Sequence, residues 1–202
     1  HLGIPAESLI EEPSHDPGSE LDPSKFPLAE MAKRRWFPGF HGTLKEAKAK
    51  GETLLGIFFK EAQLQDALCR QNVRIGSKMD RNALLAWTAR VSILARQNPL
   101  PVKYRDEMAS KEFFHDLSKI SSFKEGPLLA KEFLNKRGIH MVILRHLQKT
   151  HLDGAVMRLH DGTPVIAMTL RYDRIDNFWF TLFHELAHLH LHLKHDTQDC
   201  FI

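Results

Sequence analysis

The chain has 202 residues, of which 43% are apolar and 26% are charged, as in an ordinary globular domain with a hydrophobic core. The net charge of +3 is too small to predict nucleic-acid binding on its own. No apolar stretch approaches the roughly 18 residues that a membrane helix needs, and no basic-then-apolar leader is visible. Cys69 and Cys200 lie far apart, so we expect no disulfide framework, a cytoplasmic location and no membrane contact.

The two ends of the chain look like cuts through a longer polypeptide. The sequence starts at His1 and stops at Ile202, directly after other apolar residues. Residues 11–25 are rich in Pro, Asp, Ser and Glu, which is typical of a linker. Residues 26–40 combine aromatic side chains with the basic run 33–35, which is more typical of a solvated face than of a phosphate site.

The middle of the chain has the apolar spacing of helices. The predicted helices cover residues 43–63, 80–98, 111–120 and 127–136. Asp80 is placed to cap the second of these helices, which is strongly amphipathic and ends at Asn98-Pro99. Gly138 is placed to end the last one.

The pattern changes to strands at His140. Residues 141–147 are rich in β-branched side chains, and residues 155–160 and 164–170 flank an Asp161-Gly162 turn, which predicts a hairpin. We leave open whether the strand Val165–Leu170 is an edge that could pair with an extended peptide or is covered. We expect Cys69 to be a small buried apolar residue rather than a nucleophile.

The final predicted element is a long helix over residues 175–193, with Asp176 as its N-cap. We expect its aromatic residues Phe178, Trp179, Phe180 and Phe183 to lie in the core. The predicted fold class is therefore α+β, with a helical N-terminal region followed by a small sheet and this helix.

The last helix contains the motif His184-Glu185-Leu186-Ala187-His188. Nine of the 13 histidines fall between His140 and His195, and histidine is the commonest ligand of transition metals. Residues four apart share a helix face, so both imidazoles can reach one metal ion. Zinc suits such a site, and Glu185 would be the general base that takes a proton from water. The motif therefore predicts a zinc-dependent hydrolase site with His184 and His188 as ligands.

The third metal ligand is unknown from the sequence. His192, Asp196 and Asp199 are candidates, although a straight helix carries His192 away from a compact centre, and Cys200 is weaker still. His195 falls near the same side of the helix, and His190 points elsewhere.

Two arginines precede the motif helix and admit two interpretations. Arg171 and Arg174 could orient a substrate carboxylate. Alternatively, they form structural ion pairs with neighbouring aspartates at the entry to the helix, which is the interpretation that we favour.

Residues 150–193 resemble the ImmA/IrrE family of zinc metallopeptidase-like domains, in particular the version found in HigA-like antitoxins and XRE-type regulators. The segment LGIPAESLI near the start resembles the last helix of an XRE helix-turn-helix domain, and FPLAEMAKRRWF resembles the linker that follows it. The resemblance implies three parts: the tail of a helix-turn-helix domain with its linker (1–25), a helical region (26–122) and a metallopeptidase-like domain (123–202), which has a zincin-like fold.

The resemblance also implies functional roles. His184 and His188 would be zinc ligands, Glu185 the catalytic glutamate, and the third ligand an acidic residue on a later helix, beyond Ile202. Operator DNA would bind through a helix-turn-helix that precedes His1, and the protein would be a homodimer.

Two functions follow from these expectations. In the first, the chain carries a zinc endopeptidase domain of a transcriptional regulator, with a peptide or protein substrate. In the second, it is a non-catalytic antitoxin and autorepressor whose C-terminal region binds a toxin of the HigB or RelE type and mediates dimerisation. The metal would then be structural or a sensory input.

Overall fold

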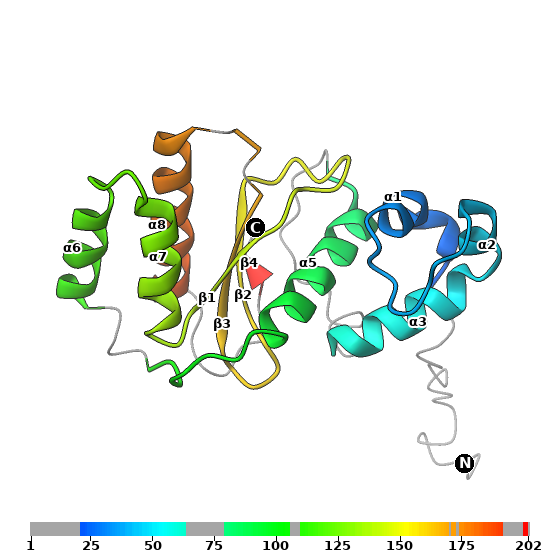
Figure 1. Ribbon diagram of the computed structural model, residues 1–202, viewed down its shortest axis with the longest axis horizontal. Helices are drawn as coiled ribbons and strands as arrows, with labels where there is room; N and C mark the ends of the chain where they lie inside the picture. The colour runs from blue at the N-terminus through cyan, green and yellow to red at the C-terminus, as the bar shows by residue number, and fades with distance from the viewer. Residues whose placement is uncertain are drawn as a thin grey trace, which may run out of the picture.

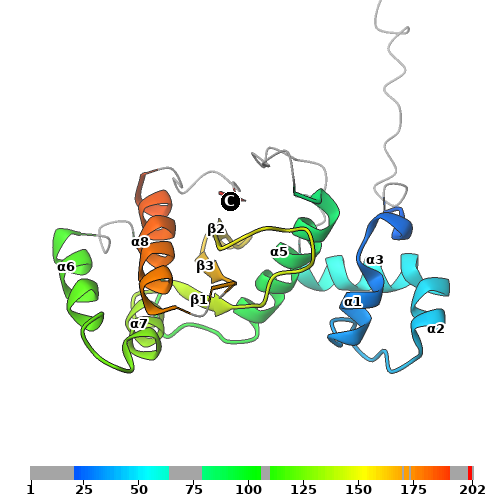
Figure 2. The same cartoon turned by 90° about the horizontal axis from the view of Figure 1, so that it is seen from above.

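The computed structural model describes residues 21–63, 79–105, 110–169, 171–172, 174–191 and 200–201. They form an α+β fold, in which a mixed sheet lies between two groups of helices (Figures 1 and 2). The helices are η2 (Pro23–Lys25), α1 (Leu28–Lys33), α2 (Leu44–Ala49), α3 (Gly51–Ala62), α5 (Arg81–Arg96), α6 (Lys111–Ile120), α7 (Gly126–Asn135) and α8 (Ile175–Leu191). The strands are β1 (His140–Ile143), β2 (Gly154–Arg158), β3 (Pro164–Met168) and β4 (Cys200–Phe201).

The sheet has the strand order β1-β3-β2-β4. β2 and β3 are antiparallel with Val156 opposite Ile166, which confirms the predicted hairpin, and β1 runs parallel to β3. The side-chain oxygen of Asp161 accepts a hydrogen bond from the Thr163 amide at 2.9 Å and fixes the turn. β3 therefore lies between two strands, so of the two alternatives left open for this strand, the structure excludes the edge and supports the covered one.

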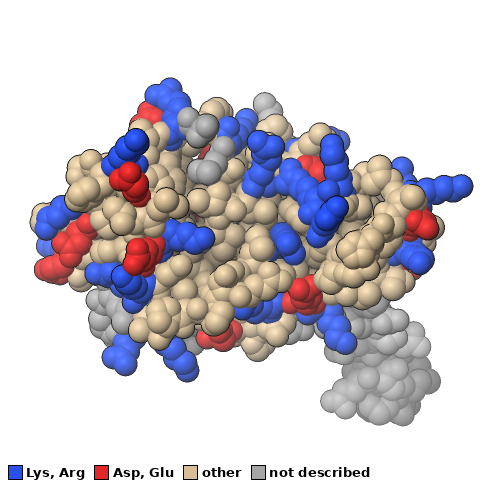
Figure 3. All heavy atoms as spheres, viewed as in Figure 1, with Lys and Arg blue, Asp and Glu red and all other residues tan. Residues whose placement is uncertain are grey.

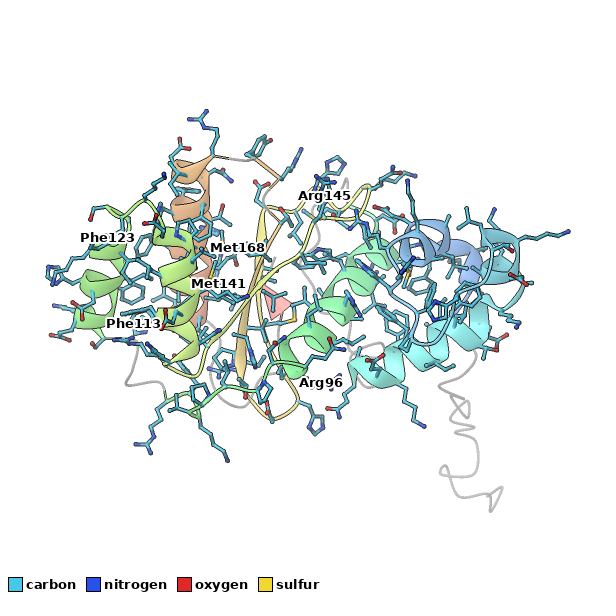
Figure 4. All side chains as sticks on the ribbon, viewed as in Figure 1. Arg96, Phe113, Phe123, Met141, Arg145 and Met168 are labelled. Carbon is cyan, nitrogen blue, oxygen red and sulfur yellow. The ribbon has the colours of Figure 1, made fainter. Side chains whose placement is uncertain are left out.

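The two faces of the sheet belong to two hydrophobic cores, because successive strand residues point to opposite faces. One core joins the sheet to α1, α2, α3 and α5, and its strand residues are Val142, Ala155, Met157, Val165 and Ala167. The other joins it to α6, α7 and α8, and its strand residues are Met141, Val156, Ile166 and Met168. Figure 4 shows Met141 and Met168 on the side of the sheet that faces α7 and α8.

Most predicted helices are confirmed, and their ends have local causes. The Asp80 carboxylate accepts hydrogen bonds from the amides of Asn82 and Ala83 at 3.0 and 3.1 Å and caps α5. After α7, Gly138 has a positive φ of 75°, which favours glycine at a helix end.

The predicted helix over residues 43–63 is wrong in one respect, because it is two helices, α2 and α3, that meet at Lys50. The reason is tertiary packing. A Cβ added at Gly51 would lie 2.8 Å from the Pro23 side chain and 2.9 Å from that of Leu28. The chain turns where glycine allows this approach.

The start of α8 also differs from the prediction. The helix begins at Ile175, so Asp176 lies in its first turn and is not the N-cap. Its carboxylate pairs with Arg174 and also accepts a hydrogen bond from the Asn177 amide at 2.9 Å. The helix dipole favours a negative charge at this N-terminal end of α8. Phe178 and Trp179 are buried as expected, and Phe183 is partly buried, but Phe180 is 73% exposed. The expectation that Phe180 lies in the core is wrong because its position on α8 faces away from the sheet.

Several sequence predictions lie outside the described residues. They concern residues 1–20, Cys69, Leu170, His192, His195, Asp196 and Asp199, and the side chain of Cys200. The division into regions 26–122 and 123–202 stays a prediction, although α6, which precedes residue 122, shares its core with α7 and α8. Among the described helices, none combines the length and the apolar character needed to cross a bilayer.

Candidate functional site

Helix α8 positions the HExxH motif against the sheet. Its buried side chains include Phe178, Leu182, Leu186 and Leu189, which recur at intervals of three and four. This stripe packs on β2 and β3. Because the stripe fixes the rotation of the helix, it also decides which motif residues are buried and which reach solvent.

The two motif histidines converge. His184 and His188 have their Nε2 atoms 3.0 Å apart, and their rings meet nearly at right angles, with centroids 4.6 Å apart. Two nitrogen ligands at 2.0–2.1 Å from a tetrahedral zinc ion would lie about 3.3 Å apart. The pair is therefore close to the separation that a shared zinc ion would require.

Glu185 lies beside this pair but is buried. Its residue exposure is 5%, and burial raises the pKa of its carboxyl group to about 8. At 3.6 residues per turn, His184, His188 and Glu185 fall within an arc of about 100° on the helix. A carboxyl group held away from water next to a histidine pair is a common arrangement for proton transfer.

Gly154, the first residue of β2, forms the wall against Glu185. A Cβ added there would lie 2.8 Å from Glu185 Oε1 and 2.7 Å from Thr181 Cγ2. Because real Cβ contacts are essentially never so short, only glycine allows α8 this close approach. Sequence reasoning missed Gly154, since nothing local shows which strand the motif helix covers.

The third ligand is not found in the described part of the chain. There, no group of three or more His, Cys, Asp or Glu side chains is placed to hold a metal ion. The candidates His192, Asp196 and Asp199 lie outside the described residues.

Arg171 and Arg174 both have acidic neighbours. Arg174 donates to both carboxylate oxygens of Asp176, at 3.0 and 2.6 Å, and this contact raises the pKa of Arg174 and lowers the pKa of Asp176. Arg171 lies 3.9 Å from Asp153 and over the ring of Tyr172. This geometry agrees with the structural interpretation and leaves a substrate role untested.

A pocket that the sequence did not reveal lies at the N-terminal end of α8. It has a volume of about 580 Å³ and is lined by Tyr172, Arg174, Asp176, Asn177 and Phe180. The Phe180 ring is stacked on the His184 ring, with centroids 6.2 Å apart and planes at 15°. The pocket therefore adjoins the histidine pair.

Comparisons with models of known protein families, with curated proteins and with solved structures find no match.

Proposed function

We propose that the chain carries a zinc-dependent peptide hydrolase site of the zincin type, within an ImmA/IrrE-like domain of a DNA-binding regulator. The observation that carries this proposal is the convergence of the His184 and His188 Nε2 atoms at 3.0 Å. A small sheet and a helix that carries the motif are both present among the described residues, and they support the proposal. The DNA-binding segment, the homodimer and the toxin partner rest on that resemblance alone.

Each motif residue has a distinct role in this proposal. His184 and His188 would hold the zinc ion, together with a third ligand that is not among the described residues. Bound zinc supplies a Lewis acid that polarises the scissile carbonyl group and makes water more acidic. Glu185 accepts a proton at its carboxylate and later returns it to the leaving amine, as a general base and then a general acid.

The burial of Glu185 suits this cycle. A carboxyl group with a pKa near 8 holds a proton more readily than an exposed glutamate, which helps the return of the proton to the amine. A positive charge nearby would lower this pKa and favour the ionised form that starts the cycle.

The first test is the zinc content of the purified protein, measured by elemental mass spectrometry. We expect about one zinc ion per chain, a loss of zinc in His184→Ala and no loss in His190→Ala. His190 is a matched control because it lies on the same helix but packs against Phe114. Equal zinc in all three proteins would overturn the assignment of the ligands.

The second test is the cleavage of a peptide library by the zinc-loaded protein. Glu185→Gln should retain zinc and lose cleavage, by a factor of about 10² or more for a general base. Equal cleavage by the variant would exclude Glu185 as the base. Bound zinc without any cleavage would instead favour the non-catalytic antitoxin and repressor, in which the metal is structural or sensory.

A further inference from the structure

The pocket at the start of α8 is lined by two large aromatic side chains that are exposed to solvent. Phe180 is 73% exposed and Tyr172 is 48% exposed, although both carry large apolar rings. Burying such a ring typically removes 150–250 Å² of surface from water. The pocket volume of about 580 Å³ falls in the range of pockets that bind small organic molecules.

The pocket lies in line with the histidine pair along α8. Asn177 precedes His184 by seven residues, so it shares a face with His184 about 10 Å away along the helix axis. Phe180, one turn from His184, lies between them and stacks on the His184 ring. An extended peptide advances about 3.3 Å per residue. In a peptide that ran parallel to α8, a side chain two or three residues from a peptide bond at His184 would therefore reach this pocket.

The charges of the lining select an uncharged group. Among the described lining residues, Arg174 and Asp176 carry the only charges, and they neutralise each other through a bidentate ion pair. What remains is the aromatic surface of Tyr172 and Phe180 and the amide of Asn177. A large apolar side chain would cover both rings without burying an unpaired charge.

We propose that this pocket is the substrate subsite that binds a large apolar side chain, aromatic or branched, two or three residues from the bond that is cleaved. Phe180 is the specificity-determining residue of this subsite, because its ring faces both the pocket and His184. This inference rests on the proposed peptide hydrolase function and names the class of its substrate.

The test separates binding from cleavage. N-acetyl-phenylalaninamide and N-acetylglycinamide are titrated into the zinc-free chain and followed by two-dimensional NMR. We expect saturable shifts at Asn177 and Phe180 and an affinity about tenfold higher for the phenylalanine probe. Phe180→Ala and Tyr172→Ala should remove this preference, and Leu128→Ala, a matched exposed residue on α7 with 71% exposure, should keep it.

Three outcomes would overturn the subsite. These are equal affinities for the two probes, a preference that survives Phe180→Ala, and a change from dimer to monomer in Phe180→Ala on sedimentation, which would assign the pocket to self-association. A correctly folded variant is recognised by its dispersed NMR spectrum.

Cleavage of the peptide library by the zinc-loaded protein then distinguishes a failure of the inference from a failure of the proposed function. Cleavage with large apolar residues enriched two or three positions from the cut supports both. Cleavage without this enrichment overturns the subsite and keeps the hydrolase. If the probe binds in a manner that depends on Phe180 but no peptide is cleaved, the hydrolase function is overturned. The pocket then remains an apolar binding pocket, but its role as a substrate subsite is overturned.

Discussion

At the scale of single residues, Glu185 links the chemistry of the site to the stability of the fold. Its carboxyl group is buried between α8 and β2, and its pKa is raised from 4.5 to about 8 by desolvation. A group with a higher pKa in the folded state binds its proton more tightly there than in the unfolded chain. Its stabilising effect is therefore complete below about pH 4.5 and is lost as the pH rises through about 8.

We predict that Glu185→Gln flattens this dependence. In the metal-free protein, the free energy of unfolding should fall by up to about 1.4 kcal/mol per pH unit between pH 5 and 8 because of Glu185. Urea unfolding with EDTA at pH 5.5 and 7.5 measures the difference. Between pH 5.5 and pH 7.5, the free energy of unfolding of the variant should increase by about 2 kcal/mol relative to that of the wild type. Parallel pH dependences in the two proteins would contradict the burial of Glu185.

Gly154 offers a second prediction at this scale. In Gly154→Ala, the new methyl group would collide with Glu185 and Thr181, so we expect a loss of about 1–3 kcal/mol in the free energy of unfolding. Gly56→Ala is the matched control, because a Cβ at Gly56 on α3 meets nothing within 4 Å and should stabilise the helix by about 0.5–1 kcal/mol. Chemical denaturation of both variants decides, and equal effects would contradict the close packing of α8 on β2.

The site shows which residue properties are visible in a sequence. The convergence of His184 and His188 follows from helix periodicity alone, so the motif predicts it. The burial of Glu185, the contact with Gly154 and the exposure of Phe180 depend on the rotation of α8 against the sheet. That rotation is set by contacts between distant segments, and a motif does not encode it.

At the scale of elements, the Asp80 cap and the hairpin turn were predictable because their causes are local, whereas the predicted N-cap of α8, Asp176, is wrong. The Asp80 cap and the hairpin turn at Asp161 are fixed by side chains that bond to amides two or three residues away. The break at Lys50 and the central place of β3 have no local cause. The break arises because Gly51 packs against Pro23. β3 is central because β1 pairs directly with it, although β2 lies between them in the sequence.

Gly138 allows a prediction about one such element end. It has a φ of +75°, and a Cβ there would lie 2.4 Å from the backbone nitrogen of Tyr104. Gly138→Ala should therefore lose more than about 2 kcal/mol, from left-handed strain and a backbone collision together. Gly39 has a similar φ of +67°, but a Cβ there would meet nothing within 4 Å. Gly39→Ala should therefore lose only about 1–2 kcal/mol in the free energy of unfolding. Thermal and urea unfolding of the two variants compare them, and equal losses would exclude the collision.

At the scale of the whole molecule, the sheet is the shared wall of two cores. The same short strands are buried on both faces, so their apolar runs are nearly continuous. The N-terminal helices share one of these cores with the sheet. The sequence showed the elements of each region but not this shared core, because the pairing of faces is a long-range property.

Arg34, the residue that follows α1, forms one of the polar links between the N-terminal helices and the segment that follows β1. Its guanidinium donates to the carbonyl oxygens of Arg145 and His146, at 2.8 and 2.9 Å, and to Glu30 at 2.6 Å. These carbonyls belong to the loop that follows β1, over which Lys and Arg side chains gather (Figures 3 and 4). Desolvation by burial is the largest cause that lowers the pKa of His146 in this loop. The positive charges of Arg171, Arg34 and Arg145 lower this pKa further.

We predict that Arg34→Met loosens this link while it keeps an apolar stem in contact with Trp36, over which the arginine now lies. The variant leaves two carbonyl groups without their charged donor, so we expect a loss of about 1–3 kcal/mol. Hydrogen exchange should rise first in residues 144–151, and the strands β2 and β3 should keep their protection, because each core still holds its own face of the sheet. Arg35→Met is the control at the neighbouring position. A uniform rise in exchange across both cores would contradict a local link and show that the two cores unfold together.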